Sequence, residues 1–382
     1  MPLWSDIERV LRPATADIAW ADALAAELAS GCPVRTTQTS LARASGSAIA
    51  ALYARLEQTT SPASPHSGDP DSTWMSRTDF CWVNVRASAI DTTPGSFIQA
   101  AKLLPGIAAR SILLAPFHPV QFDLVYAPET VTIVDTALAD PVLTEAGISP
   151  ADQLRAFISA ARLLRKSVGY ELLPYVAQFS RLAMERPELF RWVALDDERL
   201  SLAHADPEFP YRTEDRLRDA GVVASIATAS REDYGVTTFR KLETDTPQML
   251  IAKDKAYYSA IRLCMDQGLW PVPAHARAGV GIPSFLGYNG QDDFPVFAYR
   301  DADGLDVGED AYGVVAPYAF YDDIPPNKPP VTVVPVNHDA VEYYASVFSL
   351  WRDSFGFDFV RFNAVDQLFS DQIDEADRKS VV

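Results

Sequence analysis

The sequence has few of the features that identify a protein class at once. Its three cysteines, Cys32, Cys81 and Cys264, have no CxxC spacing, so they predict neither a disulfide framework nor a zinc site. No apolar run reaches the length that a membrane-spanning helix needs. The first residues, MPLWSDIERVLRP, lack a basic stretch followed by an apolar one, so we expect no signal peptide and a cytoplasmic protein.

Basic residues are scarce relative to acidic ones. Lys and Arg number 33 against 51 Asp and Glu, and the formal net charge is −18. Nucleic acids and anionic membranes are bound by clusters of Lys and Arg, so we expect neither as a partner. The phosphate-binding patterns GxGxxG and GxxxxGK[ST] are also absent, which argues against a nucleotide-binding, doubly wound sheet.

Strand and helix patterns alternate along much of the 382 residues, 48% of which are hydrophobic. Apolar, β-favouring runs predict four strands, at 80–88, 109–119, 170–178 and 357–363. Helical spacing of apolar residues predicts helices between them, one of them starting at Ser149 with Gly169 just beyond its end. Strands that alternate with helices form parallel βα units, and without a phosphate loop the TIM barrel is favoured.

The composition also predicts where the parts of the chain begin and end. We expect a helical N-terminal extension over 1–58, a linker over 59–73 rich in turn-forming residues, and the first part of a barrel over 74–176. An inserted domain over 177–335 interrupts the rhythm, and barrel helix 3 and strand 4 follow over 336–376. The predicted fold class is therefore α/β, a (β/α)8 TIM barrel of which only the first four βα units are present.

Four segments, in this order, resemble the α-amylase superfamily of retaining α-glycosidases and transglycosylases. They are WVNVRASAID, SILLAPFHP, the stretch from VTIVDTALADP to YELLPYVAQ, and FDFVRFNAVDQ. The resemblance implies a TIM barrel with a protruding domain after strand 3, which is where the predicted insertion falls. It also implies an oligosaccharide or α-glucan substrate, and it places Arg361 two residues before the position of the nucleophilic Asp, which is Asn363 here.

This chain departs from the family pattern at several positions. The third strand of the family usually ends in Asp-x-x-x-Asn-His, where this chain reads ELLPYV, and Gln367 stands where the family has a His. An amide is a poor nucleophile, and retaining hydrolysis needs a carboxylate nucleophile and a carboxylic acid about 5 Å apart. Asn363 therefore cannot form the glycosyl ester, and the carboxylate nearest to it in sequence is Asp366.

Residues at the carboxyl ends of barrel strands line the active site of a TIM barrel. Arg361 inside an apolar strand needs a partner, and we expect it to orient a neighbouring carboxylate or amide. With Asn363 and Asp366 it forms the predicted catalytic set. The predicted substrate-binding residues are His118, Gln121, Glu171 and Gln178.

No cofactor or metal is predicted. The acidic stretches GQDDFP and DADGLDVGED are of the kind that binds calcium, but the second lacks the full twelve-residue pattern, so we expect solvated loops. His118, Glu171 and Asp366 each have a structural alternative, as a packed loop histidine, a buried paired carboxylate and an ordinary loop acid. The tyrosines of the insertion are expected in its core rather than against sugar rings.

The end of the sequence suggests a truncated gene. The last six residues, DRKSVV, are what the start of a widely used sequencing adapter encodes when it is read in frame. We therefore expect 377–382 to be an artefact, with the natural protein continuing past Ala376 to the acid/base residue. A single base change from GAC to AAC would also account for Asn363.

Three functions remain open from the sequence. The first is an α-amylase-like glycoside hydrolase or glucosyltransferase acting on α-glucosidic bonds, inactive in this form. The second is a non-catalytic carbohydrate-binding relative that has lost its carboxylates, as the missing Asn, His and Asp of the family pattern indicate. The third is a barrel enzyme of different chemistry that uses Glu171 or Asp366.

Overall fold

The structure is a computed structural model, and it divides the chain into two compact units. It describes residues 3–30, 36–66, 72–90, 93–120, 125, 128–173, 176–177, 179–190, 192–194, 217–242, 244–271, 314–315 and 338–362. Unit 1 comprises Met1–Pro119, Thr132–Leu172 and Phe348–Phe362, and unit 2 comprises Val120–Val131, Leu173–Val347 and Asn363–Val382.

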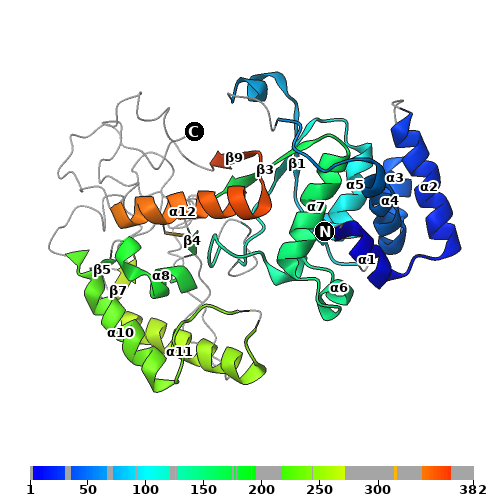
Figure 1. Ribbon diagram of the computed structural model, residues 1–382. Coiled ribbons are helices and arrows are strands. Elements are labelled where there is room, and N and C mark those ends of the chain that lie inside the picture. Colours follow the sequence, from blue (N-terminus) through cyan, green and yellow to red (C-terminus); the bar gives the residue numbers. More distant parts are fainter. Residues whose placement is uncertain are drawn as a thin grey trace. The chain divides into compact units, whose positions relative to one another are not determined.

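In the described part of the chain, four α-helices lie in or at the end of the region predicted to be a helical extension. They are α1 (Leu3–Leu11), α2 (Thr15–Ala29), α3 (Gln38–Arg43) and α4 (Gly46–Thr59). Two buried side chains tie them to later helices: Trp4 Nε1 donates to the carbonyl of Ala156 at 2.9 Å, and the Tyr53 hydroxyl donates to that of Ala101 at 2.8 Å. The helices therefore belong to the same compact unit as the sheet (Figure 1).

The centre of unit 1 is a four-stranded parallel sheet with the order β1-β2-β3-β9. Its strands are β1 (Phe80–Val83), β2 (Ser111–Leu114), β3 (Ser167–Leu172) and β9 (Phe359–Phe362). The connecting helices are α5 (Phe97–Leu103), α6 (Pro141–Glu145) and α7 (Pro150–Leu163), and α12 (His338–Phe355) leads into β9. The predicted α/β class with parallel βα units is confirmed.

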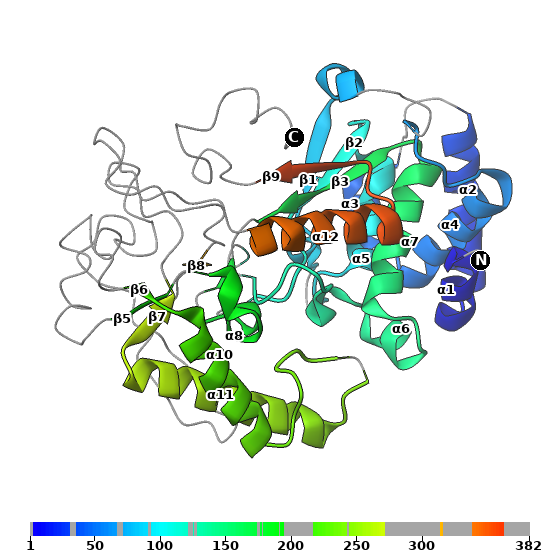
Figure 2. The same cartoon turned by 60° about the vertical axis from the view of Figure 1, so that its left-hand side comes forward.

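The two faces of this sheet differ. Alternation along β3 places Val168, Tyr170 and Leu172 on one face, all of them buried. The C-terminal half of α12 covers this face, where the Trp351 and Tyr170 ring centroids lie 6.1 Å apart (Figure 2). The opposite face carries Glu171 and also Trp82 of β1, a residue that is 49% exposed. Polar and aromatic side chains therefore gather on the face that α12 leaves uncovered.

Gly169 corrects one sequence prediction, because it lies inside β3 and not at the end of a helix. Helix α7 ends at Leu163, and Arg165 adopts the left-handed conformation, with φ of 57°, that was expected of the glycine. A Cβ on Gly169 would lie 2.4 Å from the ring of Phe359 on the neighbouring strand. The glycine is needed because that ring packs directly on the backbone of β3.

The start of β9 is held by a buried carboxylate. Asp358 Oδ2 accepts a hydrogen bond from the backbone N–H of Val168 at 2.7 Å, and Oδ1 accepts one from Arg162 of α7 at 3.1 Å. One side chain thus fixes β9 against both the neighbouring strand and the covering helix. Its charge is compensated by the arginine, as a buried carboxylate requires.

Unit 2 is built from short strands and a helix pair. Its described elements are β4 (Val176–Ala177), α8 (Arg181–Glu185), β5 (Trp192–Ala194), β6 (Leu217–Arg218), α10 (Ala220–Asp233), α11 (Pro247–Asp266), β7 (Leu269–Pro271) and β8 (Val314–Val315). β5 pairs with β6 and β7, and β4 with β8, all antiparallel. The predicted strand 170–178 is therefore two strands, the second belonging to unit 2.

Buried Arg181 connects the elements of the unit 2 core. It donates to the carbonyl of Phe239 at 2.7 Å, pairs with Asp254, and lies over the Tyr257 ring at 4.3 Å. The Tyr257 hydroxyl donates to the carbonyl of Phe179 at 2.6 Å.

Among the described residues, no helix is long and apolar enough to cross a membrane.

Candidate functional site

The candidate site lies at the carboxyl ends of the parallel strands of unit 1. In the sheet register, Glu171 of β3 is opposite Arg361 of β9, so their side chains project from the same face. Trp82 of β1 projects from that face as well, level with Gly169 of β3 and so two residues nearer the strand starts. Three side chains from three strands therefore converge without any loop to position them.

Glu171 is the buried centre of this group, with only 1% of its side chain exposed. Its Oε1 accepts a hydrogen bond from the Arg361 guanidinium, and its Oε2 accepts one from Trp82 Nε1 at 3.2 Å. Trp82 reaches Glu171 across β2, which lies between their strands. A buried carboxylate needs partners of this kind, so the two donors account for its presence in the sheet.

Arg361 and Trp82 connect the buried carboxylate to solvent. The Arg361 side chain is 51% exposed, and Trp82 as a whole residue is 49% exposed. Phe80 extends the aromatic surface on the same face, 46% exposed, and its ring lies edge-on to that of Phe359 with centroids 5.2 Å apart. The site thus combines hydrogen-bond donors with aromatic surface, the combination that suits sugar hydroxyls and the C–H faces of sugar rings.

A second network holds the loops that follow β1 and β2. Arg86 donates to the carbonyls of Pro116 and His118 at 2.7 and 2.9 Å, and to Asp135 Oδ2 at 2.5 Å. The Asp135 Oδ1 atom accepts from the backbone N–H of Ala137 and so begins the short helix η4 (Thr136–Leu138). One guanidinium therefore positions two strand-end loops at once.

His118 belongs to this second network and is fully buried. Its Nδ1 lies 3.0 Å from the carbonyl of Ile133, an arrangement that makes Nδ1 the donor in the neutral ring. Burial, assisted by the positive charge of Arg86, lowers the pKa of His118 to about 4. The imidazole is therefore neutral at physiological pH, and its ring packs against Trp351 with centroids 5.3 Å apart.

The structure describes three of the predicted site residues and brings two of them together. It brings Glu171 and Arg361 together as an ion pair and places His118 in the Arg86 network. The predicted residues Gln121, Gln178, Asn363 and Asp366 lie outside the described residues. Both Glu171 oxygens accept hydrogen bonds, so this carboxylate orients the Arg361 guanidinium and the Trp82 indole.

Sequence reasoning missed Trp82 and the Arg86–Asp135 pair. Trp82 lies within the predicted strand 80–88, and its alternation with Phe80 would have placed two aromatic residues on one face. The pairing of Arg86 with Asp135 joins residues 49 positions apart and leaves no pattern in the sequence.

In the part of the chain that the structure describes, no three His, Cys, Asp or Glu side chains are grouped to hold a metal ion.

Comparison with known proteins adds no assignment. No protein-family model matches the chain, and no curated protein matches it.

Proposed function

We propose that this chain forms part of an α-amylase-like (β/α)8 barrel that acts on α-glucosidic bonds by hydrolysis or glucosyl transfer. The observation that carries the proposal is the Glu171–Arg361 pair, which joins the ends of the third and fourth parallel strands in chain order. TIM-barrel enzymes use the carboxyl ends of their strands for chemistry, and this pair lies there. In such a barrel, the face that bears Trp82, Glu171 and Arg361 would be the interior.

The four segments that resemble the superfamily coincide with the four parallel strands and their connections. Arg361 occupies the place of the arginine that precedes the nucleophile in that family, and its guanidinium binds a carboxylate on the neighbouring strand. Asn363, two residues later, stands at the nucleophile position. An amide cannot form the glycosyl ester, so this chain binds the sugar without cleaving it.

The second candidate is a non-catalytic carbohydrate-binding protein. The observation that favours it is that Glu171 is occupied by two donors while Asn363 replaces the nucleophile. Exposed Trp82 and Arg361 would then serve recognition alone. Both candidates share the sugar-binding surface and differ in whether a carboxylate at position 363 attacks the sugar.

Binding of maltoheptaose tests the shared part of the proposal. Trp82→Ala removes the aromatic surface and the donor to Glu171, and we expect its dissociation constant, measured by isothermal titration calorimetry, to rise about tenfold. Tyr234→Ala is the matched control, because Tyr234 is 40% exposed and lies in unit 2. No saturable binding by the unsubstituted chain, or equal losses in both variants, would contradict a sugar site on this face.

Asn363→Asp separates the two candidates. The variant and the unsubstituted chain are incubated with α-glucosyl fluoride, whose fluoride leaves without a general acid, and intact-protein mass spectrometry looks for a glucosyl ester. An ester on the variant alone would support the enzyme, since the variant restores the carboxylate nucleophile that retaining chemistry requires. Unchanged maltoheptaose binding with no ester on either protein would favour the carbohydrate-binding candidate.

A further inference from the structure

A separate cavity of about 370 Å³ lies at the amino-terminal ends of the parallel strands of unit 1. Three arginines line it: Arg77 precedes β1, Arg110 immediately precedes β2, and Arg165 precedes β3. Neighbouring parallel strands start at the same end of the sheet, so residues far apart in sequence come together here. The Glu171 site lies at the other ends of the same strands.

The positive charge of this cavity is little compensated. Among the described residues that line it there is no Asp or Glu, although the whole chain has a net charge of −18. Arg77 donates to the neutral hydroxyl of Thr73 at 2.8 Å. Arg110 Nε lies 3.7 Å from Asp79, but both side chains are largely exposed, and such pairs are weak. A cationic cavity on an acidic protein indicates an anionic ligand.

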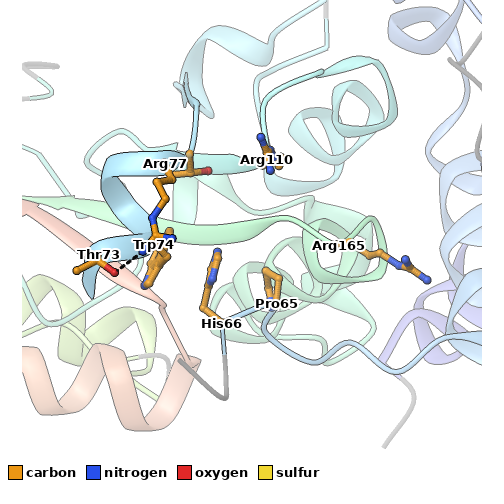
Figure 3. A pocket seen from close by; sticks show the side chains of 8 residues that line it. Pro65, His66, Thr73, Trp74, Arg77, Arg110 and Arg165 are labelled. Atoms are coloured by element: carbon orange, nitrogen blue, oxygen red, sulfur yellow. Dashed lines mark hydrogen bonds between the residues drawn. The ribbon is translucent and has the colours of Figure 1, made fainter. Parts of the chain in front are cut away.

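Two aromatic rings form one wall of the cavity. The His66 and Trp74 rings are stacked, with centroids 3.7 Å apart and planes 13° from parallel. The Trp74 ring also packs edge-on against the ring of Phe359 of β9, with centroids 5.8 Å apart. Figure 3 shows Arg77 extending beside Trp74 and Arg165 directed away from the stacked rings. Arg165 is exposed, so its long side chain is able to turn towards a bound anion.

We propose that this cavity binds a small phosphorylated sugar. Guanidinium groups bind phosphate oxygens through pairs of hydrogen bonds, and Arg77 and Arg110 supply two of these groups to the cavity lining. The volume exceeds what a phosphate alone fills and lies within the range of about 300–1,000 Å³ typical of small-molecule sites. The sugar lies along the His66–Trp74 wall, and Arg165 closes over the phosphate. This inference does not depend on the function proposed above.

Titration calorimetry with glucose 6-phosphate, alongside glucose, tests the proposal on the full chain. We expect saturable binding of the phosphate ester, no binding of glucose at this site, and weaker binding as salt is added. Arg110→Gln and Arg165→Gln should each raise the dissociation constant of glucose 6-phosphate about tenfold, the effect of one charge-assisted contact. Circular dichroism confirms that the variants are folded.

Arg9→Gln is the matched control. Arg9 of α1 has the same 77% side-chain exposure as Arg110 and likewise pairs with an exposed aspartate, Asp6, but it does not line the cavity. Its substitution should leave the affinity unchanged. The proposal is overturned if glucose 6-phosphate shows no saturable binding, or if Arg110→Gln and Arg165→Gln bind it as tightly as the unsubstituted chain does. It is also overturned if Arg9→Gln lowers the affinity for glucose 6-phosphate as much as these two substitutions do.

Discussion

At the residue scale, His118 shows how surroundings set the chemistry of one side chain. Burial against Trp351 and the nearby charge of Arg86 both disfavour the protonated ring, while its Nδ1 contact with the Ile133 carbonyl partly opposes them. The pKa falls from 6.5 to about 4. His118 was predicted as a substrate-binding residue, with a packed loop histidine as the alternative, and the geometry shows a packed, neutral ring.

This pKa shift predicts acid sensitivity with a defined sign. Between pH 6.5 and about 4 the unfolded chain takes up a proton that the folded ring does not, so the free energy of unfolding falls as the pH is lowered through that window. The full effect of His118 is on the order of 3 kcal/mol. Urea unfolding at several pH values measures it.

His118→Gln provides the comparison, because an amide can still donate to Ile133 but does not titrate. We expect the difference in unfolding free energy between the two proteins to narrow or reverse as the pH falls below 6.5. Carboxylates titrate in both proteins and cancel in that difference. A difference that is constant with pH would contradict the account of His118.

At the element scale, the patterns of the sequence predicted the parallel strands well and their ends less well. Apolar runs mark β1, β2 and β9, although only β2 is largely buried and β1 exposes Phe80 and Trp82 on the uncovered face. The end of α7 was misplaced because Gly169 looks like a helix-ending glycine, whereas Arg165 takes the left-handed conformation. Glycine is also used for close packing, and sequence alone does not separate the two uses.

The same limit applies to the candidate site. Glu171 and Arg361 were each selected from the sequence, and Arg361 was expected to orient a carboxylate or amide. Which group it orients depends on the register of β9 against β3, which pairs residues 190 positions apart. Asp358 fixes that register by binding Val168 and Arg162, a contact that no local pattern encodes.

Arg165, in the turn between α7 and β3, has a strained backbone conformation whose energetic cost can be measured. A non-glycine residue in the left-handed region costs on the order of 1 kcal/mol, so Arg165→Gly should raise the free energy of unfolding by about that amount. Arg155→Gly within α7 should lower it instead, because glycine is unfavourable in a helix interior. Chemical denaturation measures both. A loss of stability in Arg165→Gly would show that its side chain contributes more than its backbone costs.

At the scale of the whole molecule, each compact unit has a core of its own. Phe157 is fully buried in unit 1 and Phe239 in unit 2. The two cores are built from different kinds of element, helices on a parallel sheet in one and a helix pair with short antiparallel strands in the other. Separate cores of this kind can unfold as separate cooperative units.

Differential scanning calorimetry should therefore resolve two transitions. Phe157→Ala should lower the temperature of one and Phe239→Ala that of the other, since each removal costs about 3–5 kcal/mol in its own core. The transition that each variant leaves unchanged is the internal control. A single transition that both substitutions shift equally would show that the units unfold together.

The packing of Phe359 on Gly169 carries a consequence for the divergence of this sequence. The two positions lie on neighbouring strands, and a side chain at 169 would occupy the space of the aromatic ring at 359. A mutation at 169 alone meets a steric penalty, whereas the same mutation after loss of the ring does not. The order of substitutions is thus constrained. Homologues that keep this sheet should pair glycine with an aromatic residue, or a side chain at 169 with a small residue at 359.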